Sequence, residues 1–208
     1  MPAFETYRPG AHGVPDRRCS IRRARPGDVP GVLVVASSRG PQPADLGDRL
    51  ARWIADPGRL VLVAHAPSDD PVPSARTVVG WTMLARWQGG ADAREGWLVG
   101  ALTVAPGRRR AGIGARLLAG LLDRPPGRGA AVHSVVNATN RASIALHEGL
   151  GFHEVDRGPS FAGITFTGGI GVLLRVGPDR AAAGPAAGER TVGDHGTDRD
   201  EIEHEEPV

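Results

Sequence analysis

Apolar residues alternate with polar ones in several short stretches of this chain and recur every three to four residues in others. The first pattern predicts strands and the second predicts amphipathic helices. The predicted strands cover residues 20–24, 59–65, 77–87, 96–104, 130–136 and 152–157, followed by a hairpin of 164–167 and 170–176 around Gly168 and Gly169. The predicted helices cover 29–37, 43–55, 112–122 and a short segment after Asn140. This order of strands and helices predicts one α/β (α+β) domain over residues 19–176.

The two ends of the chain lack these patterns. Residues 1–18 contain Pro, Gly and Arg but no apolar run, so they do not form a secretory signal, and we expect them to be disordered. Residues 177–208 are rich in Ala, Gly and Pro and then acidic, which predicts a disordered tail. No apolar run approaches the ~20 residues that cross a bilayer. A single cysteine, Cys19, is typical of a reducing compartment, so we expect a cytoplasmic protein with no membrane contact.

Charge is divided unevenly along the chain. The formal net charge is +2, but residues 177–208 contain nine acidic and three basic residues, which leaves +8 on the rest. All 25 basic residues are arginine. A positive domain suits a polyanionic small molecule. Scattered arginines and an aromatic content of 4% argue against a nucleic-acid partner.

The most informative segment runs from Leu102 to Leu118. An apolar strand ends in the basic loop Pro-Gly-Arg-Arg-Arg-Ala-Gly-Ile-Gly, and the loop opens an amphipathic helix. Free backbone N–H groups and the positive end of the helix dipole then face a ligand together. Gly112 and Gly114 remove two Cβ atoms from that approach. The segment predicts an anion site, and phosphate groups fit it best.

The sequence of the loop limits which classes of phosphate-containing ligand it can bind. No Gly-Lys-Ser/Thr follows, so the loop is not a Walker A motif. The third glycine of a dinucleotide fingerprint is absent, because Leu117 stands at its position. Arg109-x-x-Gly112-x-Gly114 after an apolar strand resembles the acetyl-CoA pyrophosphate loop of the GNAT superfamily of N-acetyltransferases.

A second segment, from Asn137 to Phe152, resembles the other signature of the same superfamily. Asn140 matches the cofactor-contacting asparagine, Ser143 has the usual place in the following helix, and Leu-Gly-Phe matches the helix exit. Asn140 also fits a helix N-cap and Gly151 a position just past the helix end, without any reference to a family. The two signatures occur in the expected order, one helix and one strand apart.

The resemblance covers about residues 20–176 and implies a GNAT fold. Such a fold has a central mixed, mostly antiparallel sheet of six to seven strands with about four helices, splayed in mid-sheet for acetyl-CoA as co-substrate. The implied cofactor-binding residues are Leu102, Thr103, Val104, Arg109, Arg110, Ala111, Gly112, Ile113, Gly114, Ala115, Asn140 and Ser143. By the same resemblance, an amine attacks the thioester directly in a ternary complex. The sequence has no metal-ligand spacing, so we expect no metal.

His147 stands where the superfamily usually has the tyrosine that protonates the departing thiolate. A histidine is competent in this role near neutral pH, but a histidine that only hydrogen-bonds its surroundings fits the sequence equally. For the base that takes the amine proton, His133 is the first candidate, because it shares a strand face with Val135 and Asn137. His65 is the second, and a water relay without a single base is equally compatible.

Two functions stay open at this point. The first is an N-acetyltransferase acting on a primary amine of a small molecule or of a peptide or protein N-terminus. The second is a non-catalytic acyl-CoA-binding regulatory module, which the replacement of the usual tyrosine by His147 favours. The sequence does not identify the amine or the length of the acyl group, and a homodimer is left open.

Overall fold

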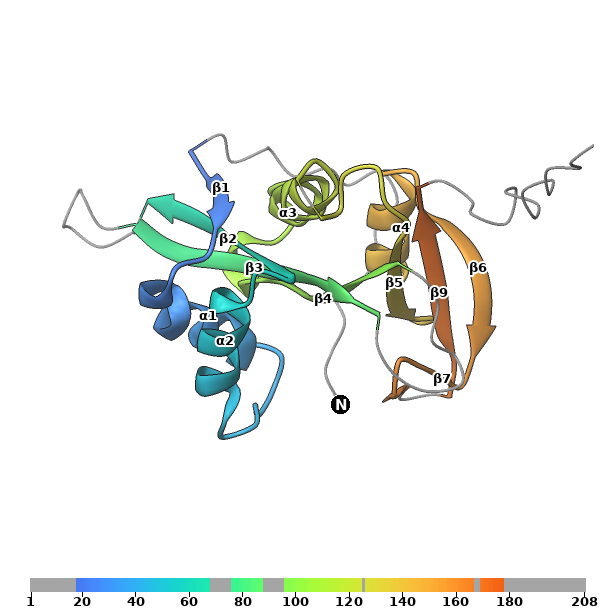
Figure 1. The fold of residues 1–208 in the computed structure, drawn as a ribbon, viewed down its shortest axis with the longest axis horizontal. Helices are drawn as coiled ribbons and strands as arrows, with labels where there is room; N and C mark the ends of the chain where they lie inside the picture. Colours follow the sequence, from blue (N-terminus) through green and yellow to red (C-terminus); the bar gives the residue numbers. More distant parts are fainter. Residues whose placement is uncertain (1–17, 68–75, 88–95, 125, 167–168, 178–208) are drawn as a thin grey trace, which may run out of the picture. The chain divides into compact units, whose positions relative to one another are not determined.

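The computed structural model describes residues 18–67, 76–87, 96–124, 126–166 and 169–177. Within these residues, seven strands form one mixed sheet in the order β1-β2-β3-β4-β5-β9-β6 (Figure 1). The strands are β1 (Ser20–Arg23), β2 (Arg59–Pro67), β3 (Arg76–Arg86), β4 (Trp97–Val104), β5 (Val132–Asn137), β6 (His153–Gly158) and β9 (Gly171–Val176). Neighbours are antiparallel except β4 and β5, which are parallel. The predicted fold class is confirmed, and so is the order of elements as far as β6.

Four α-helices cover the two faces of this sheet in the described part of the chain. Helices α1 (Val29–Ser37) and α2 (Leu46–Ala55) lie on one face, and α3 (Ile113–Leu122) and α4 (Arg141–Glu148) lie on the other (Figure 1). We call these the α1 face and the α3 face. Short 3-10 turns precede α1 at Pro26–Asp28 and α3 at Pro106–Arg108.

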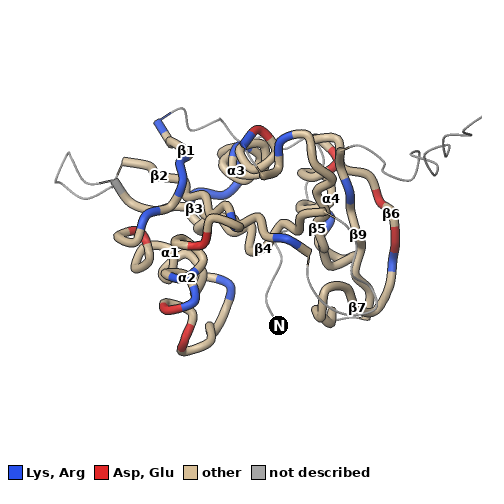
Figure 2. The backbone as a smooth tube through the Cα atoms, in the orientation of Figure 1, with Lys and Arg blue, Asp and Glu red and all other residues tan. Residues whose placement is uncertain are grey.

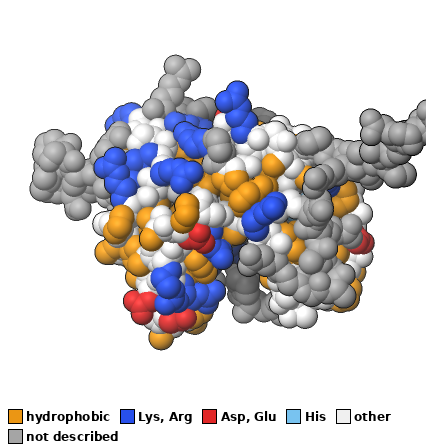
Figure 3. Space-filling view, viewed as in Figure 1, with side chains coloured by type: hydrophobic (Ala, Val, Ile, Leu, Met, Phe, Trp, Pro, Cys, Tyr) orange, Lys and Arg blue, Asp and Glu red, His pale blue; other side chains and the backbone are white. Residues whose placement is uncertain are grey.

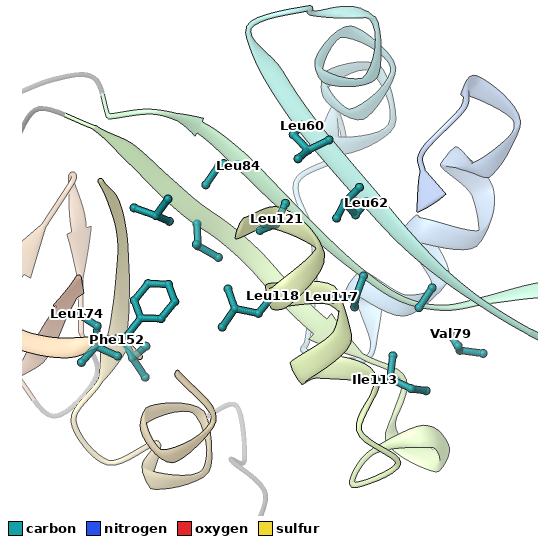
Figure 4. Close-up of a cluster of buried hydrophobic side chains, with 14 of the residues drawn as sticks. Leu60, Leu62, Val79, Leu84, Ile113, Leu117, Leu118, Leu121, Phe152 and Leu174 are labelled. Atoms are coloured by element: carbon teal, nitrogen blue, oxygen red, sulfur yellow. The ribbon is translucent and has the colours of Figure 1, made fainter. Parts of the chain in front are cut away.

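Each face has its own apolar core, as the alternation of strand residues predicts. Leu117, Leu118 and Leu121 of α3 pack on the α3 face against Leu62 and Leu84 (Figure 4). On the α1 face, α1 and α2 pack against strands β2 and β3, and a smaller cluster lies beside β5 and β9. The α1-face clusters contain Val32, Leu50, Val63 and Trp81 in the first and Trp87, Phe161 and Leu173 in the second.

Strands β4 and β5 are paired for only part of their length. The ladder between them runs from Trp97 opposite Val132 to Val99 opposite Ser134 and then stops. Beyond that point β5 stays paired with β9 as far as Asn137, while β4 stays paired with β3 as far as Val104. The sheet therefore splays between β4 and β5, as the resemblance implies.

The predicted hairpin at the end of the domain is wrong. Ile164 and Thr165 form β8 and pair with β7 (Ser160–Phe161), while β9 pairs with β5 and β6. The turn between β7 and β8 is Ala162-Gly163, and both residues have positive φ, 51° and 73°. A two-residue hairpin turn of type I′ requires positive φ at both central residues. The sequence pattern instead favours the Gly168-Gly169 pair, six residues further along the chain.

Other boundaries shift by a few residues. Helix α2 begins at Leu46 and not at Pro43, and β2 extends to Pro67. The two predicted disordered ends, apart from residues 18 and 177, lie outside the described residues.

Candidate functional site

A β-bulge in β4 marks the point where the sheet splays. The register with β3 shifts so that Gly100 faces Met83 and Thr103 faces Trp81. Ala101, inside the bulge, has φ of 55°. This left-handed conformation costs an L-residue roughly 1–2 kcal/mol, and such strain is typical of functional sites. The sequence does not reveal this conformation of Ala101, because alanine gives no signal for a left-handed residue.

The bulge also decides which side chains of β4 face which side. Leu102 and Val104 pack with the α3-face core, whereas Ala101 and Ala105 pack with the α1-face core. The edge of Leu102–Val104 that faces β5 has no ladder partner there among the described residues. Strand edges of this kind accept an extended ligand through main-chain hydrogen bonds.

The loop after β4 leads directly into the first turn of α3. Gly112 precedes the helix with φ of 72°, and a Cβ built on it meets nothing within 4 Å. The loop is joined to the strand because Arg109 Nε donates to the carbonyl oxygen of Val104 at 3.3 Å. By helix geometry, the first-turn N–H groups beginning at Ile113 have no acceptor within the helix. The predicted residues 109–115 thus lie together at one helix N-terminus.

Gly114 has a different surrounding from Gly112. A Cβ on Gly114 would lie 3.1 Å from Leu146 Cδ1 of α4 and 3.9 Å from Val104 Cγ2. The glycine therefore lets α3 approach α4 closely across the splay. The sequence predicts a role for Gly114 only in ligand approach, and its contact with Leu146 is a packing role that local sequence does not reveal.

Helix α4 begins as expected. The Asn140 side chain caps it by accepting from the backbone N–H of Ser143 at 3.2 Å. Gly151, just beyond the helix, has φ of 85°. Asn140 and Ser143 therefore lie at the end of α4 that follows β5, on the β5 side of the splay.

His147 is almost completely buried, with 1% of its surface exposed. Its Nδ1 donates to the Ser143 carbonyl oxygen at 2.7 Å, and its ring lies edge-on to Phe152. Nε2 is buried and has no hydrogen-bond partner among the described residues. Burial lowers the pKa of His147 and the hydrogen bond to Ser143 offsets only part of this, so the pKa lies below its usual value. The side chain is therefore neutral at pH 7, with Nε2 as an acceptor.

His133 lies on the other face of the sheet. It is opposite Leu98 in the β4–β5 ladder, one pair before the ladder stops. Its ring is edge-on to Trp87, at 5.4 Å between centroids, and Leu98 packs in the same α1-face cluster as Trp87. Val135 packs in this cluster too, as the shared strand face predicts. His133 and His147 thus lie on opposite faces of the sheet.

His65 belongs to a separate network at the β1 edge. Its Nε2 lies 2.9 Å from Arg22 Nη2 and 3.2 Å from Asp28 Oδ1, and Asp28 also accepts from Arg22 and from the backbone N–H of Arg25. Burial raises the pKa of Asp28, but the Arg22 and Arg25 bonds and the nearby charges outweigh it, so the pKa lies below its usual value. This network fixes β1 to the start of α1 and lies three strands away from β5.

The two strands that border the splay, β4 and β5, carry no acidic side chain. Among the sheet strands, acidic residues occur only at the edge, on β6, where Glu154 pairs with Arg157 (Figure 2). The described residues contain no group of three or more His, Cys, Asp or Glu positioned to hold a metal ion. In the same described ranges, no helix is long and apolar enough to cross a membrane.

The comparison with solved structures gives the same fold at low sequence identity. A phosphinothricin acetyltransferase from Sinorhizobium meliloti, in complex with acetyl-CoA, is 20% identical over 84% of this chain and 96% of its own, with a TM-score of 0.59. NAA60 of Arabidopsis thaliana, also with acetyl-CoA, is 18% identical over 76% and 97%, with a TM-score of 0.59. A ribosomal-protein-alanine N-acetyltransferase from Brucella melitensis is 25% identical over 75% and 97%, with a TM-score of 0.56.

Sequence comparison gives the family. No curated protein sequence matches this chain significantly. The model of the acetyltransferase (GNAT) family matches residues 33–152, which is more than half of the chain and includes the bulged strand, the glycine loop and helix α4. The chain therefore belongs to the GNAT family of acetyltransferases.

Proposed function

We propose that this protein transfers the acetyl group of acetyl-CoA to a primary amine, within a domain of residues 19–176. The main support is the splay itself: β4 leaves β5 after Val99, and the strand edge so exposed ends at a glycine loop and a helix N-terminus. Acetyl-CoA fits such a site, because its extended pantetheine arm leads to a diphosphate. The acetyl-CoA complexes among the similar structures support the same co-substrate.

Acetyl-CoA would be bound mainly by backbone groups. The edge of Leu102, Thr103 and Val104 would align the pantetheine arm as an added strand. The first-turn N–H groups of α3 and the arginines before them would hold the diphosphate. The other residues proposed for this site are Arg109, Arg110, Ala111, Gly112, Ile113, Gly114, Ala115, Asn140 and Ser143.

The reaction needs one proton removed and one supplied. The amine nitrogen attacks the thioester carbonyl, a C–N bond forms, and the C–S bond breaks as the thiolate leaves. A backbone N–H near Val104 would stabilise the oxyanion. We assign removal of the amine proton to His133, because β1 to β5 and β9 contain no carboxylate and His133 lies next to the end of the β4–β5 ladder.

His147 would supply a proton to the departing thiolate from Nε2. Its Nδ1 is already committed to the Ser143 carbonyl, so Nε2 must first be protonated before it can donate. A lowered pKa makes the protonated form rarer at pH 7 but a stronger acid. The proton therefore has to reach His147 during the reaction, either from the amine or through water.

The same observation favours a second candidate function. A buried, neutral His147 and the lack of a carboxylate on β1 to β5 and β9 also suit a non-catalytic acyl-CoA-binding module. Such a module would bind acetyl-CoA through the same loop but would not turn it over.

The test is steady-state release of CoA from acetyl-CoA with a panel of small amines and of peptides with free N-termini. We expect turnover that depends on the amine, and a lower kcat with a nearly unchanged KM for acetyl-CoA in His147→Phe. Tight acetyl-CoA binding without turnover on any amine would favour the module.

A further inference from the structure

The α1 face beside the bulge contains a cation, Arg39, that forms no ion pair with another described residue. Arg39 follows the end of α1, and its Nη1 donates to Thr103 Oγ1 at 3.4 Å. Its side chain is exposed and has no carboxylate partner among the described residues. Asp45 and Asp48, at the start of α2, are exposed and do not pair with it. The remaining guanidinium donors are therefore available to a ligand.

The backbone that presents Arg39 is held in place by local hydrogen bonds. The Arg39 N–H donates to the Ala36 carbonyl oxygen at 3.0 Å. The Gln42 side chain donates to the carbonyl oxygens of Ala36 and Gly40 at 3.1 and 2.9 Å. Gly40, with φ of 120°, lies in the turn between Ala36 and Gln42. A side chain on a fixed turn loses less entropy when it binds a ligand.

Thr103 connects Arg39 to the strained part of β4. Its side chain is buried, and Oγ1 donates to the Ala101 carbonyl oxygen at 3.2 Å. Its register partner Trp81 has a buried indole Nε1–H without a hydrogen-bond partner among the described residues. Donors therefore gather around Thr103 on the α1 face, and the strands there supply no acidic side chain.

The geometry points to an acceptor amine that also bears a carboxylate, and Arg39 is the residue that binds this carboxylate. This inference rests on the proposed function, because it places the acceptor on the α1 face of the same splay. A planar guanidinium binds a carboxylate through two parallel hydrogen bonds and fixes its orientation. The second ammonium group of a polyamine would be repelled by the Arg39 guanidinium, and the strands there supply no carboxylate to bind it. We therefore assign the acceptor to the amino-acid class of small molecules.

The experiment compares each amine with its own carboxamide. Acetyl-CoA-dependent turnover is measured for α-, β- and γ-amino acids and for the matching carboxamides, and the ratio of the two kcat/KM values is taken as the carboxylate preference. The variants are R39Q, which removes the charge, and R39K, which keeps it. R52Q is the matched control, because Arg52 is an exposed arginine on α2 with no side-chain contact of this kind. Acetyl-CoA binding is measured separately by calorimetry.

We expect the wild type to prefer the carboxylate, and R39Q to reduce that preference by roughly ten- to a hundredfold, as expected for a charge-assisted hydrogen bond. The loss should lie mainly in KM, R39K should restore part of the preference, and R52Q should keep it. Equal turnover of acid and carboxamide by the wild type would overturn the inference and leave the proposed function intact. So would acetyl-CoA binding with no turnover of any carboxylated amine. Absence of acetyl-CoA binding would overturn the proposed function itself and this inference with it.

Discussion

The two faces of the splayed sheet differ in how they are built. On the α3 face, the proposed acetyl-CoA site consists mostly of backbone: the edge of β4, the loop at Gly112 and the first turn of α3. On the α1 face, the proposed acceptor site consists of side chains from three separate segments, Arg39, Thr103 and His133. Arginine side chains are spread over the face seen in Figure 3 and do not form one stripe.

This difference shows which kind of site can be predicted from a short stretch of sequence. A backbone site needs glycines and a helix start at fixed spacing, so one continuous segment reveals it. A side-chain site depends on which distant residues the fold brings together, so no single segment reveals it. The same contrast explains why one co-substrate can be proposed for the α3 face while the acceptor has to be inferred from charge.

The strongest test of the backbone site is Gly112→Glu. A carboxylate at this open position would repel the diphosphate, and at about 4 Å the repulsion amounts to roughly 4 kcal/mol at an effective dielectric constant near 20. We expect a loss of acetyl-CoA affinity of about a hundredfold or more, measured by calorimetry. Gly112→Asn is the control, because asparagine tolerates the left-handed conformation without a charge. Unchanged affinity in Gly112→Glu would contradict the assignment of the loop.

The side-chain site is tested by His133→Gln against His65→Gln. Loss of a general base lowers turnover by roughly a hundredfold or more, so we expect this fall in kcat/KM for His133→Gln. His65→Gln should change stability and leave the rate within about twofold, because His65 lies in the Arg22–Asp28 network. Circular dichroism verifies that both variants are folded. If His65→Gln gives the larger fall, the assignment is wrong.

The buried state of His147 predicts a pH dependence of stability. The unfolded histidine has a pKa of about 6.5 and the folded one lies below it. At pH values well above about 6.5, neither the folded nor the unfolded state binds a proton at His147. As the pH falls below about 6.5 the unfolded state gains a proton first, so the free energy of unfolding decreases by up to about 1.4 kcal/mol per pH unit until the folded pKa is reached.

Denaturant unfolding between pH 7.5 and 5 measures this slope. His147→Phe should flatten it, whereas His153→Gln, at an exposed position on β6, should keep it. An unchanged slope in His147→Phe would mean that His147 is not the group responsible.

The smallest expected effect is a difference in thermal stability between alanine substitutions at the two glycines of the loop. Gly112→Ala should cost roughly 1–2 kcal/mol through its positive φ, which lowers the Tm by about 2–8 °C in a domain of this size. In Gly114→Ala, the gain in helix propensity of up to about 1 kcal/mol offsets the push on Leu146, so we expect a Tm within about 2 °C of the wild type. Equal losses in the two variants would remove the distinction.

The sequence predicted the main strands and helices from local periodicity and the glycine loop from a short motif, whereas the splay was implied only by the resemblance to the GNAT superfamily. It did not predict the left-handed Ala101, because the bulge depends on the register between β3 and β4. It chose the wrong turn in the last hairpin, since Ala162 gives no turn signal beside Gly163. Arg39 was missed because its contact with Thr103 joins residues 64 positions apart.

The most direct test of the account is calorimetric titration of the purified protein with acetyl-CoA, with Gly112→Glu alongside. The account predicts a Kd in the micromolar range for the wild type, about 8 kcal/mol of binding free energy, and a Kd weaker by about a hundredfold or more for the variant. Absence of wild-type binding at millimolar acetyl-CoA would contradict the proposed site on the α3 face and the function built on it.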